Sequence, residues 1–236
     1  MLYVILYFIV CFPVILFLWS LDSAKNKNKI HLYGIYGYFG LPGQGKTISM
    51  TRRLNDYRKK YGDKIYIMTN YNYLDQDFEF TDWRQLLEEY DRPLVVAWDE
   101  VQNVFNARNF KDFPIQLLTL LTQVRKNNGI QILYTSQRWH FVDKNFRTLS
   151  FGCYDCKTIL GRFTVASMFD PEDYDQKCST VEVEKKQKIH AKIRNCFIQT
   201  KKEREAFDSY KMLLSAKSKE YMTREELAQL ENRQVI

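Results

Sequence analysis

The sequence predicts an α/β fold, in which a mostly parallel central sheet is flanked by helices and preceded by one N-terminal transmembrane helix. Three observations predict it: a glycine-rich loop between a strand and a helix, an apolar strand that ends in two acids, and an uncharged apolar run at the start of the chain. The 236 residues suffice for one sizeable α/β domain plus short extensions.

The glycine-rich loop, residues 40–47, reads GLPGQGKT and fits the pattern G-x-x-x-x-G-K-[ST] at each fixed position. Glycines let the backbone wrap closely around an anion, and the following helix adds the positive end of its dipole. Residues 31–39 before the loop are typical of a strand, and apolar residues recur at helical spacing after it. The alternative is a glycine turn that happens to contain Gly-Lys-Thr. The residues expected to bind a nucleotide are Gly40, Gly43, Gln44, Gly45, Lys46, Thr47 and Ile48.

The acidic pair ends residues 93–100, which read PLVVAWDE. A continuous apolar run is typical of a central parallel strand, and open α/β sheets bind ligands at the carboxyl ends of such strands. We expect Asp99, together with Thr47, to hold Mg²⁺, and Glu100 to orient or deprotonate the attacking water. The alternative is an ordinary buried strand with a solvated acidic end. Together the two motifs predict a P-loop NTPase that uses ATP and Mg²⁺.

Further strands and helices complete the predicted domain. Residues 129–137 form another central strand, and Gln137 at its tip can sense the γ-phosphate, although a simple strand end is the alternative. Asp82 is the expected N-cap of a short helix. The other expected strands are residues 64–70, 151–155 and 158–166, and the expected helices are residues 82–90, 114–126 and 201–216.

Residues 2–19 carry no charge and approach the length that crosses a bilayer as a helix, about 20 residues. Lysines follow the run at 25, 27 and 29, which places the bulk of the chain in the cytoplasm. A cleaved signal peptide and a buried core helix are the weaker alternatives. The predicted organisation is a transmembrane helix at 1–21, a basic polar linker at 22–30, a P-loop ATPase domain at 31–200 and a C-terminal helical tail at 201–236.

The net charge of +7 suits nucleic acid or an anionic membrane surface as a partner. The five cysteines are an odd, sparse set, which argues against a secreted disulfide framework. A zinc site built from Cys153, Cys156, Cys178 and Cys196 is conceivable, but their spacing favours free buried thiols. Basic residues that can line a DNA channel, or form plain surface, are Arg52, Arg53, Arg58, Lys59, Lys60, Lys185, Lys186 and Lys188.

Residues 99–110, DEVQNVFNARNF, begin an ordered series of motifs. A helix ending in Arg-Lys follows, then Gln137, then Val-Asp-Lys at 142–144, Arg147 and Cys153. This order resembles the Zot-like family, which includes zonular occludens toxin and the assembly ATPase of filamentous phages. The resemblance spans about residues 32–165. It implies a membrane-anchored P-loop ATPase for phage assembly and export, similar to hexameric DNA pumps and packaging ATPases.

The resemblance also implies roles for single residues. Lys46 and Thr47 would bind phosphate and Mg²⁺, Asp99 and Glu100 would serve the metal and the water, and Gln137 would be the sensor. Arg108 is the candidate arginine finger that reaches a neighbouring subunit's nucleotide, and a surface salt bridge is its alternative role. The catalytic set is therefore Lys46, Glu100, Gln137 and Arg108, and the rival fingers are Arg125, Arg138 and Arg147.

The order of segments departs from the family, whose members carry the membrane segment after the ATPase domain. An anchor that comes first favours a host with one membrane, or a genome pumped into a preformed shell or vesicle. We therefore expect a single-pass protein of the host's inner (cytoplasmic) membrane that drives phage or virus assembly by DNA translocation, packaging or extrusion. Its expected partners are copies of itself in a hexameric ring, the membrane, DNA, and phage assembly or capsid proteins. The alternative is a nucleotide-dependent membrane scaffold with little turnover.

Overall fold

The computed structural model describes residues 30, 32–105, 107, 113–126, 128–179 and 189–207. The chain divides into two units, Met1–Leu32 and Tyr33–Ile236, and the fold described below belongs to the second. The predicted transmembrane helix at 1–21 and the tail beyond 207 lie outside the described residues. Within the described ranges, no helix is both long enough and apolar enough to span a bilayer.

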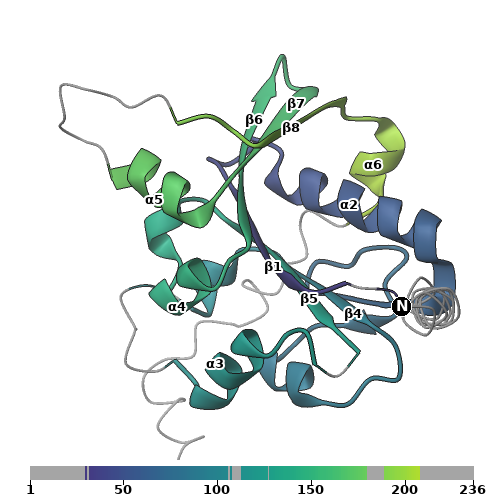
Figure 1. The fold of residues 1–236 in the computed structure, drawn as a ribbon. Coiled ribbons are helices and arrows are strands. Elements are labelled where there is room, and N and C mark those ends of the chain that lie inside the picture. The colour runs from purple at the N-terminus through teal and green to yellow at the C-terminus, as the bar shows by residue number, and fades with distance from the viewer. Residues whose placement is uncertain are drawn as a thin grey trace, which may run out of the picture. The chain divides into compact units, whose positions relative to one another are not determined.

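A mixed sheet forms the centre of the domain (Figure 1). Its eight strands in the described part of the chain lie in the order β3-β2-β4-β5-β1-β6-β7-β8. Neighbours from β3 to β6 are parallel, whereas β7 is antiparallel to both β6 and β8. This confirms the mostly parallel sheet. The strands are β1 Gly34–Phe39, β2 Tyr66–Thr69, β3 Phe78–Glu79, β4 Leu94–Trp98, β5 Ile130–Ser136, β6 Gly152–Ile159, β7 Phe163–Phe169 and β8 Ile193–Ile198.

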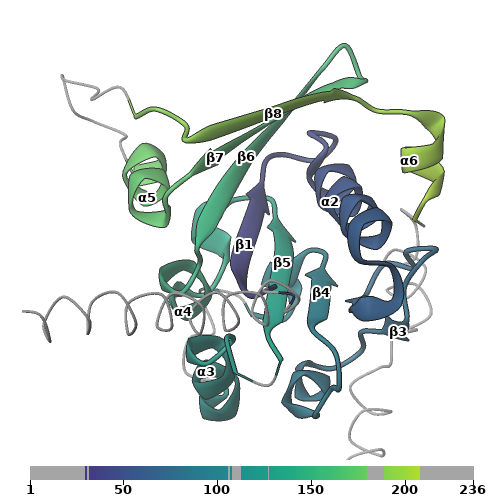
Figure 2. The same cartoon turned by 45° about the vertical axis from the view of Figure 1, so that its right-hand side comes forward.

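The parallel half of the sheet is covered on both faces, which explains its composition. All residues of β4 are buried, as its continuous apolar run predicted, and so are all residues of β5, the other expected central strand. On one face lie α2 (Lys46–Tyr61) and α6 (Lys201–Glu205), and on the other lie α3 (Ile115–Thr122), α4 (Lys144–Thr148) and α5 (Pro171–Ser179) (Figure 2). The described 3-10 helices are η1 Gly62–Lys64, η2 Trp83–Leu87, η3 Val101–Asn103 and η5 Trp139–Phe141.

An aromatic cluster fills the core beside the acidic strand. Trp98 at the end of β4 is 3% exposed, and its ring meets those of Phe80, Phe105 and Phe146 edge-on at centroid distances of 4.6, 5.4 and 6.0 Å. Edge-to-face packing is a favoured geometry of aromatic pairs. The cluster therefore fixes the end of β4, from which the two acids follow.

Several element boundaries differ from those expected. Asp82 does cap a helix, with a capping box to Gln85, but the helix is the 3-10 helix η2. The hairpin of β6 and β7 turns at residues 160–162, where Leu160 and Gly161 have positive φ, and not near residue 156. Helix α5 and strand β8 were not predicted. Pro171 in the first turn and the acids that follow are the helix-start signal that could have revealed α5.

Candidate nucleotide-binding site

The glycine-rich loop joins β1 to α2, as its motif requires. Gly40, Gly43 and Gly45 have φ values of 149°, 77° and 80°, which L side chains rarely adopt. A Cβ on Gly45 would lie 2.7 Å from Thr158 Oγ1, and a Cβ on Gly40 would lie 2.7 Å from the Cys156 carbonyl oxygen. Both glycines are therefore needed for the backbone path and for its close approach to β6. The resulting turn precedes a 16-residue helix, whose N-terminus favours anions.

Side chains of the loop meet the sheet around the start of α2. Lys46 is 6% exposed, and its Nζ lies 3.7 Å from Glu100 Oε1 and donates to the Leu41 carbonyl oxygen at 3.4 Å. Gln44 Oε1 accepts a hydrogen bond from the Thr158 backbone N–H at 2.9 Å, which ties the loop to β6. Ile48 is buried, so its side chain belongs to the core.

Asp99 lies directly across from Thr47. Thr47 Oγ1 donates to Asp99 Oδ1 at 2.9 Å, and Thr135 Oγ1 donates to the same oxygen at 2.6 Å. Asn70, just after β2, holds the Asp99 backbone through two bonds, one to its carbonyl oxygen and one from its N–H. A hydroxyl and a carboxylate side by side are hard oxygen ligands of the kind that Mg²⁺ prefers. The donor set therefore fits Mg²⁺, with Thr47 and Asp99 as the residues that would hold it.

Glu100 has an unusual backbone. Its φ of 54° and ψ of 52° are left-handed, a conformation uncommon for residues other than glycine. The Glu100 N–H donates to Thr135 Oγ1 at 2.8 Å, which fixes this turn against β5. Its carboxylate faces Lys46 and accepts a hydrogen bond from Gln102 Nε2. The turn thus directs an acid toward the lysine of the loop.

Strand β5 lies between the loop strand β1 and the acidic strand β4. Phe39 pairs with Ser136, so the next residues, Gly40 and Gln137, emerge at the same edge. Gln137 lines a pocket of about 420 Å³ beside the loop. The structure thus places Gln137 next to the loop, and its role as a sensor stays a prediction. Other residues that line this pocket include Gly40, Leu41, Gln44, Arg138, Trp139 and Asp155.

The candidate arginine fingers differ in their surroundings. Arg108 lies outside the described residues, so its predicted role stays a prediction. Arg147 stacks over Trp139 and pairs with Asp175 at 3.0 Å, and Arg125 lies 5.2 Å from the ring of Tyr33. Arg138 is exposed and lines the pocket beside the loop of its own chain.

The four described cysteines are free thiols, but only Cys153 and Cys156 of them are buried as expected, whereas Cys178 is half-buried and Cys196 is exposed. Within the described ranges, no cluster of three or more His, Cys, Asp or Glu side chains can hold a metal ion. Burial raises the pKa of Cys156 to about 12. Cys156 is therefore a neutral thiol at physiological pH.

Burial raises the pKa of the Asp99 carboxyl, while hydrogen bonds from Thr135 and Thr47 lower it. The charge of Glu100 also raises it, and that of Lys46 lowers it. The net upward shift means that the nucleotide-free folded state binds a proton more tightly than the unfolded chain. The free energy of unfolding should therefore fall as pH rises from about 4 through the raised pKa.

Replacing Asp99 with asparagine should remove this penalty while keeping an oxygen for both threonines. We expect the nucleotide-free Asp99→Asn protein to melt at a higher temperature than wild type at pH 7, with the difference shrinking towards pH 4. Thermal unfolding followed by circular dichroism checks this. Asp63→Asn, at an exposed site, is the control and should follow wild type. A lower melting temperature for Asp99→Asn at pH 7 would contradict the interpretation.

Sequence reasoning missed three polar residues that shape the site. Thr135 connects Asp99 to Glu100, Asn70 holds the Asp99 backbone, and Gln102 contacts the Glu100 carboxylate. The buried Gln102 Oε1 has no hydrogen-bond partner among the described residues. Thr135 and Asn70 are polar residues at the ends of predicted strands, and that position is the signal that could have found them.

Comparison with solved structures finds matches to this chain. The N-terminal domain of zonular occludens toxin from Neisseria meningitidis matches with a TM-score of 0.51 and 19% identity, covering 75% of this chain and 100% of that domain. The genome packaging NTPase B204 from Sulfolobus turreted icosahedral virus 2, in complex with sulfate, matches with a TM-score of 0.45 and 13% identity, covering 72% of this chain and 92% of that one. No protein-family model and no curated protein sequence matches this chain. The chain therefore has an α/β fold that fits a P-loop NTPase, and it shares this fold with the N-terminal domain of zonular occludens toxin.

Proposed function

We propose that this chain is a P-loop ATPase that powers phage or virus assembly from the host's inner membrane. The observation that carries the proposal is the contact of the two motifs, in which Thr47 hydrogen-bonds Asp99 at 2.9 Å and Lys46 faces Glu100 at 3.7 Å. The assembly role rests on the motif order that resembles the Zot-like family. The fold shared with the N-terminal domain of zonular occludens toxin is compatible with that role.

The geometry supports separate roles for the residues of the site in ATP hydrolysis. The loop backbone and the start of α2 bind the phosphates, and Lys46 neutralises charge on the β- and γ-phosphates. Mg²⁺, held by Thr47 and Asp99, would offset the phosphate charge. Glu100 orients the attacking water and accepts its proton, and Gln137 senses the γ-phosphate from the tip of β5.

Lys46 faces the Glu100 carboxylate directly. A γ-phosphate that binds Lys46 competes for the same ammonium, so nucleotide binding frees Glu100 to act on water. This arrangement couples occupancy of the loop to the availability of the base.

The contacts of Glu100 also favour a second candidate function, a membrane scaffold that binds ATP and turns over little. A carboxylate engaged by Lys46 and Gln102 is a poor base until both contacts change.

The membrane anchor, the homo-oligomeric ring and the DNA partner belong to the same proposal. The anchor rests on the uncharged run at residues 2–19, and the DNA partner on the net charge of +7. Coat, capsid or assembly proteins of the phage complete the expected set of partners. Of the basic residues considered for a DNA channel, Arg58 is held by Asp77 at 2.6 Å, whereas Lys59 and Lys60 are exposed on α2.

Lys46→Ala is the test of the nucleotide site. In the full-length protein purified in detergent, we expect ATP to bind about 10- to 100-fold more weakly, because an ammonium–phosphate contact is lost, and steady-state hydrolysis to disappear. Binding is measured with a fluorescent ATP analogue and hydrolysis by phosphate release.

Lys59→Ala removes an exposed lysine from the same helix and should match wild type in both assays. Unchanged affinity and hydrolysis in Lys46→Ala would rule out this site.

A further inference from the structure

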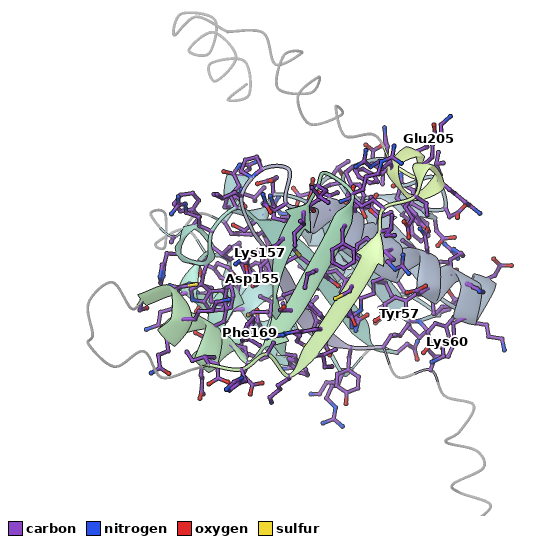
Figure 3. All side chains as sticks on the ribbon, turned by 90° about the horizontal axis from the view of Figure 1, so that it is seen from above. Tyr57, Lys60, Asp155, Lys157, Phe169 and Glu205 are labelled. Carbon is purple, nitrogen blue, oxygen red and sulfur yellow. The ribbon has the colours of Figure 1, made fainter. Side chains whose placement is uncertain are left out.

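A second pocket, of about 520 Å³, lies between α2 and the antiparallel end of the sheet. Figure 3 shows β8 beside α2, on which Tyr57 and Lys60 are labelled. Residues from α2, β1, β6, β7 and β8 line it, and we call it the arginine pocket. Its defining residues are Arg52, Arg53, Arg194, Tyr38, Tyr154 and Phe197.

Arg53 lies at the base of the arginine pocket within a set of tyrosines. Its guanidinium carbon lies 4.4 Å from the ring centre of Tyr36, and its Nε donates to Tyr57 Oη at 2.6 Å. Its Nη1 donates to the hydroxyl oxygens of Tyr38 and Tyr154, each at 3.4 Å. In the described part of the chain, no carboxylate lies within 4.0 Å of this guanidinium.

The tyrosines do not neutralise Arg53. The rings of Tyr38 and Tyr154 are stacked at 4.7 Å, and burial raises the pKa of both hydroxyls above their ordinary value. Both are therefore uncharged phenols at pH 7. A partly buried guanidinium surrounded by neutral groups keeps its full charge, and buried charges in proteins are normally paired. Arg53 thus presents an unmatched positive charge to the pocket.

Two more arginines line the pocket, Arg52 from α2 and Arg194 from β8. Arg52 lies 4.7 Å over the ring of Phe197 and pairs with Glu203 at 2.5 Å, which fixes its position. Arg194 makes no ion pair with any described residue, but its side chain belongs to the face of β8 opposite to Phe197, because side chains alternate along a strand that pairs without a bulge. Among the described residues, Asp56 is the one carboxylate that lines the pocket and Glu203 offsets Arg52, so the three arginines exceed these two carboxylates by one.

We propose that the arginine pocket binds a phosphate group, carried either by a small phosphate compound or by the backbone of a single nucleic-acid strand. A guanidinium offers a planar fork of N–H donors that matches phosphate oxygens and binds them in pairs. The pocket volume falls within the range of ligand sites, about 300–1,000 Å³. Asn195, which also lines it, adds an amide donor.

The arginine pocket is distinct from the nucleotide site but shares a helix with it. Lys46 and Thr47 begin α2, and Arg52 and Arg53 follow within two turns. Ser49 also lines the pocket, and its Oγ donates to the Gly45 carbonyl oxygen in the glycine-rich loop at 2.6 Å. A phosphate bound in the pocket therefore contacts the element that carries the loop.

The test measures two phosphate ligands against the full-length protein in detergent, with saturating ADP to occupy the loop. Calorimetry follows inorganic pyrophosphate, and fluorescence anisotropy follows a labelled oligothymidylate. We expect wild type to bind pyrophosphate, and Arg53→Gln to weaken that binding about tenfold or more, because one charge-assisted contact is lost. If the natural source is a strand, the oligonucleotide binds as well, pyrophosphate displaces it, and Arg53→Gln weakens it equally.

Three further variants show whether the binding depends on the guanidinium of Arg53 and on this pocket. Arg162→Gln changes an exposed arginine outside the pocket and should leave both affinities unchanged. Arg53→Lys keeps the charge but removes the fork, and should also weaken binding. Lys46→Ala should leave pyrophosphate binding intact, which separates this site from the nucleotide site. The proposal is overturned if wild type binds neither ligand, if Arg53→Gln binds both as tightly as wild type, or if Lys46→Ala abolishes the binding.

Discussion

Glu100→Gln should lower the rate of ATP hydrolysis by about 10²- to 10⁴-fold while ATP still binds, which is the range that general-base catalysis contributes. Glutamine fills the same space and keeps a hydrogen-bonding oxygen, but it cannot accept the proton of the attacking water. The left-handed turn and the bond from the Glu100 N–H to Thr135 involve only the backbone of this residue, so they should persist. The loss should therefore fall on the chemical step.

Single-turnover hydrolysis with excess protein isolates that step. Glu89→Gln, at an exposed position, is the matched control and should hydrolyse ATP at the wild-type rate. Equal single-turnover rates for Glu100→Gln and wild type would contradict the assignment of the base. That result would instead favour the membrane scaffold, in which nucleotide binding without rapid turnover is the functional event.

Trp98→Ala should lower the free energy of unfolding by about 3–5 kcal/mol, which is typical of removing a buried large aromatic side chain. The Trp98 ring is 3% exposed and packs edge-on against Phe80, Phe105 and Phe146. Neighbouring rings cannot collapse fully into a space of that size, so a cavity term adds to the lost burial. Urea unfolding followed by circular dichroism measures the change.

Trp83→Ala provides the control, because this tryptophan is only partly buried in the 3-10 helix η2. Its removal should cost clearly less than that of Trp98. Similar midpoints for the two variants would show that the cluster beside β4 does not dominate the stability of the core. Because Asp99 directly follows Trp98, surviving Trp98→Ala protein should also hydrolyse ATP more slowly.

The parts of the fold that the sequence predicted are those with a short-range physical cause. The run LVVAW of β4 must be buried on both faces, and the spacing of apolar residues after Thr47 fits only a helix. The hairpin boundaries, the 3-10 form of η2 and strand β8 depend on longer-range packing. In β8 only Phe197 is buried, so the strand lacks a strong apolar pattern of its own.

The residues of the candidate site also fall into those that the sequence could predict and those that it could not. Lys46 and Thr47 were predictable because the phosphate-binding turn fixes both their types and their spacing. The contribution of Thr135 depends on β5 lying between β1 and β4, which is a matter of sheet order that spacing along the chain does not reveal. Likewise, Arg53 was predicted only as a basic residue, because its tyrosine partners come from β1, α2 and β6.

The left-handed main chain at Glu100 places two opposing requirements on one residue, the stability of the turn and the rate of ATP hydrolysis. Glycine would relax that backbone by about 1–2 kcal/mol, since it lacks the Cβ that crowds the following carbonyl oxygen. It would also delete the carboxylate that faces Lys46. A glycine at position 100 would therefore stabilise the turn but remove the proposed base. A protein that hydrolyses ATP has to keep the strained glutamate at the end of β4.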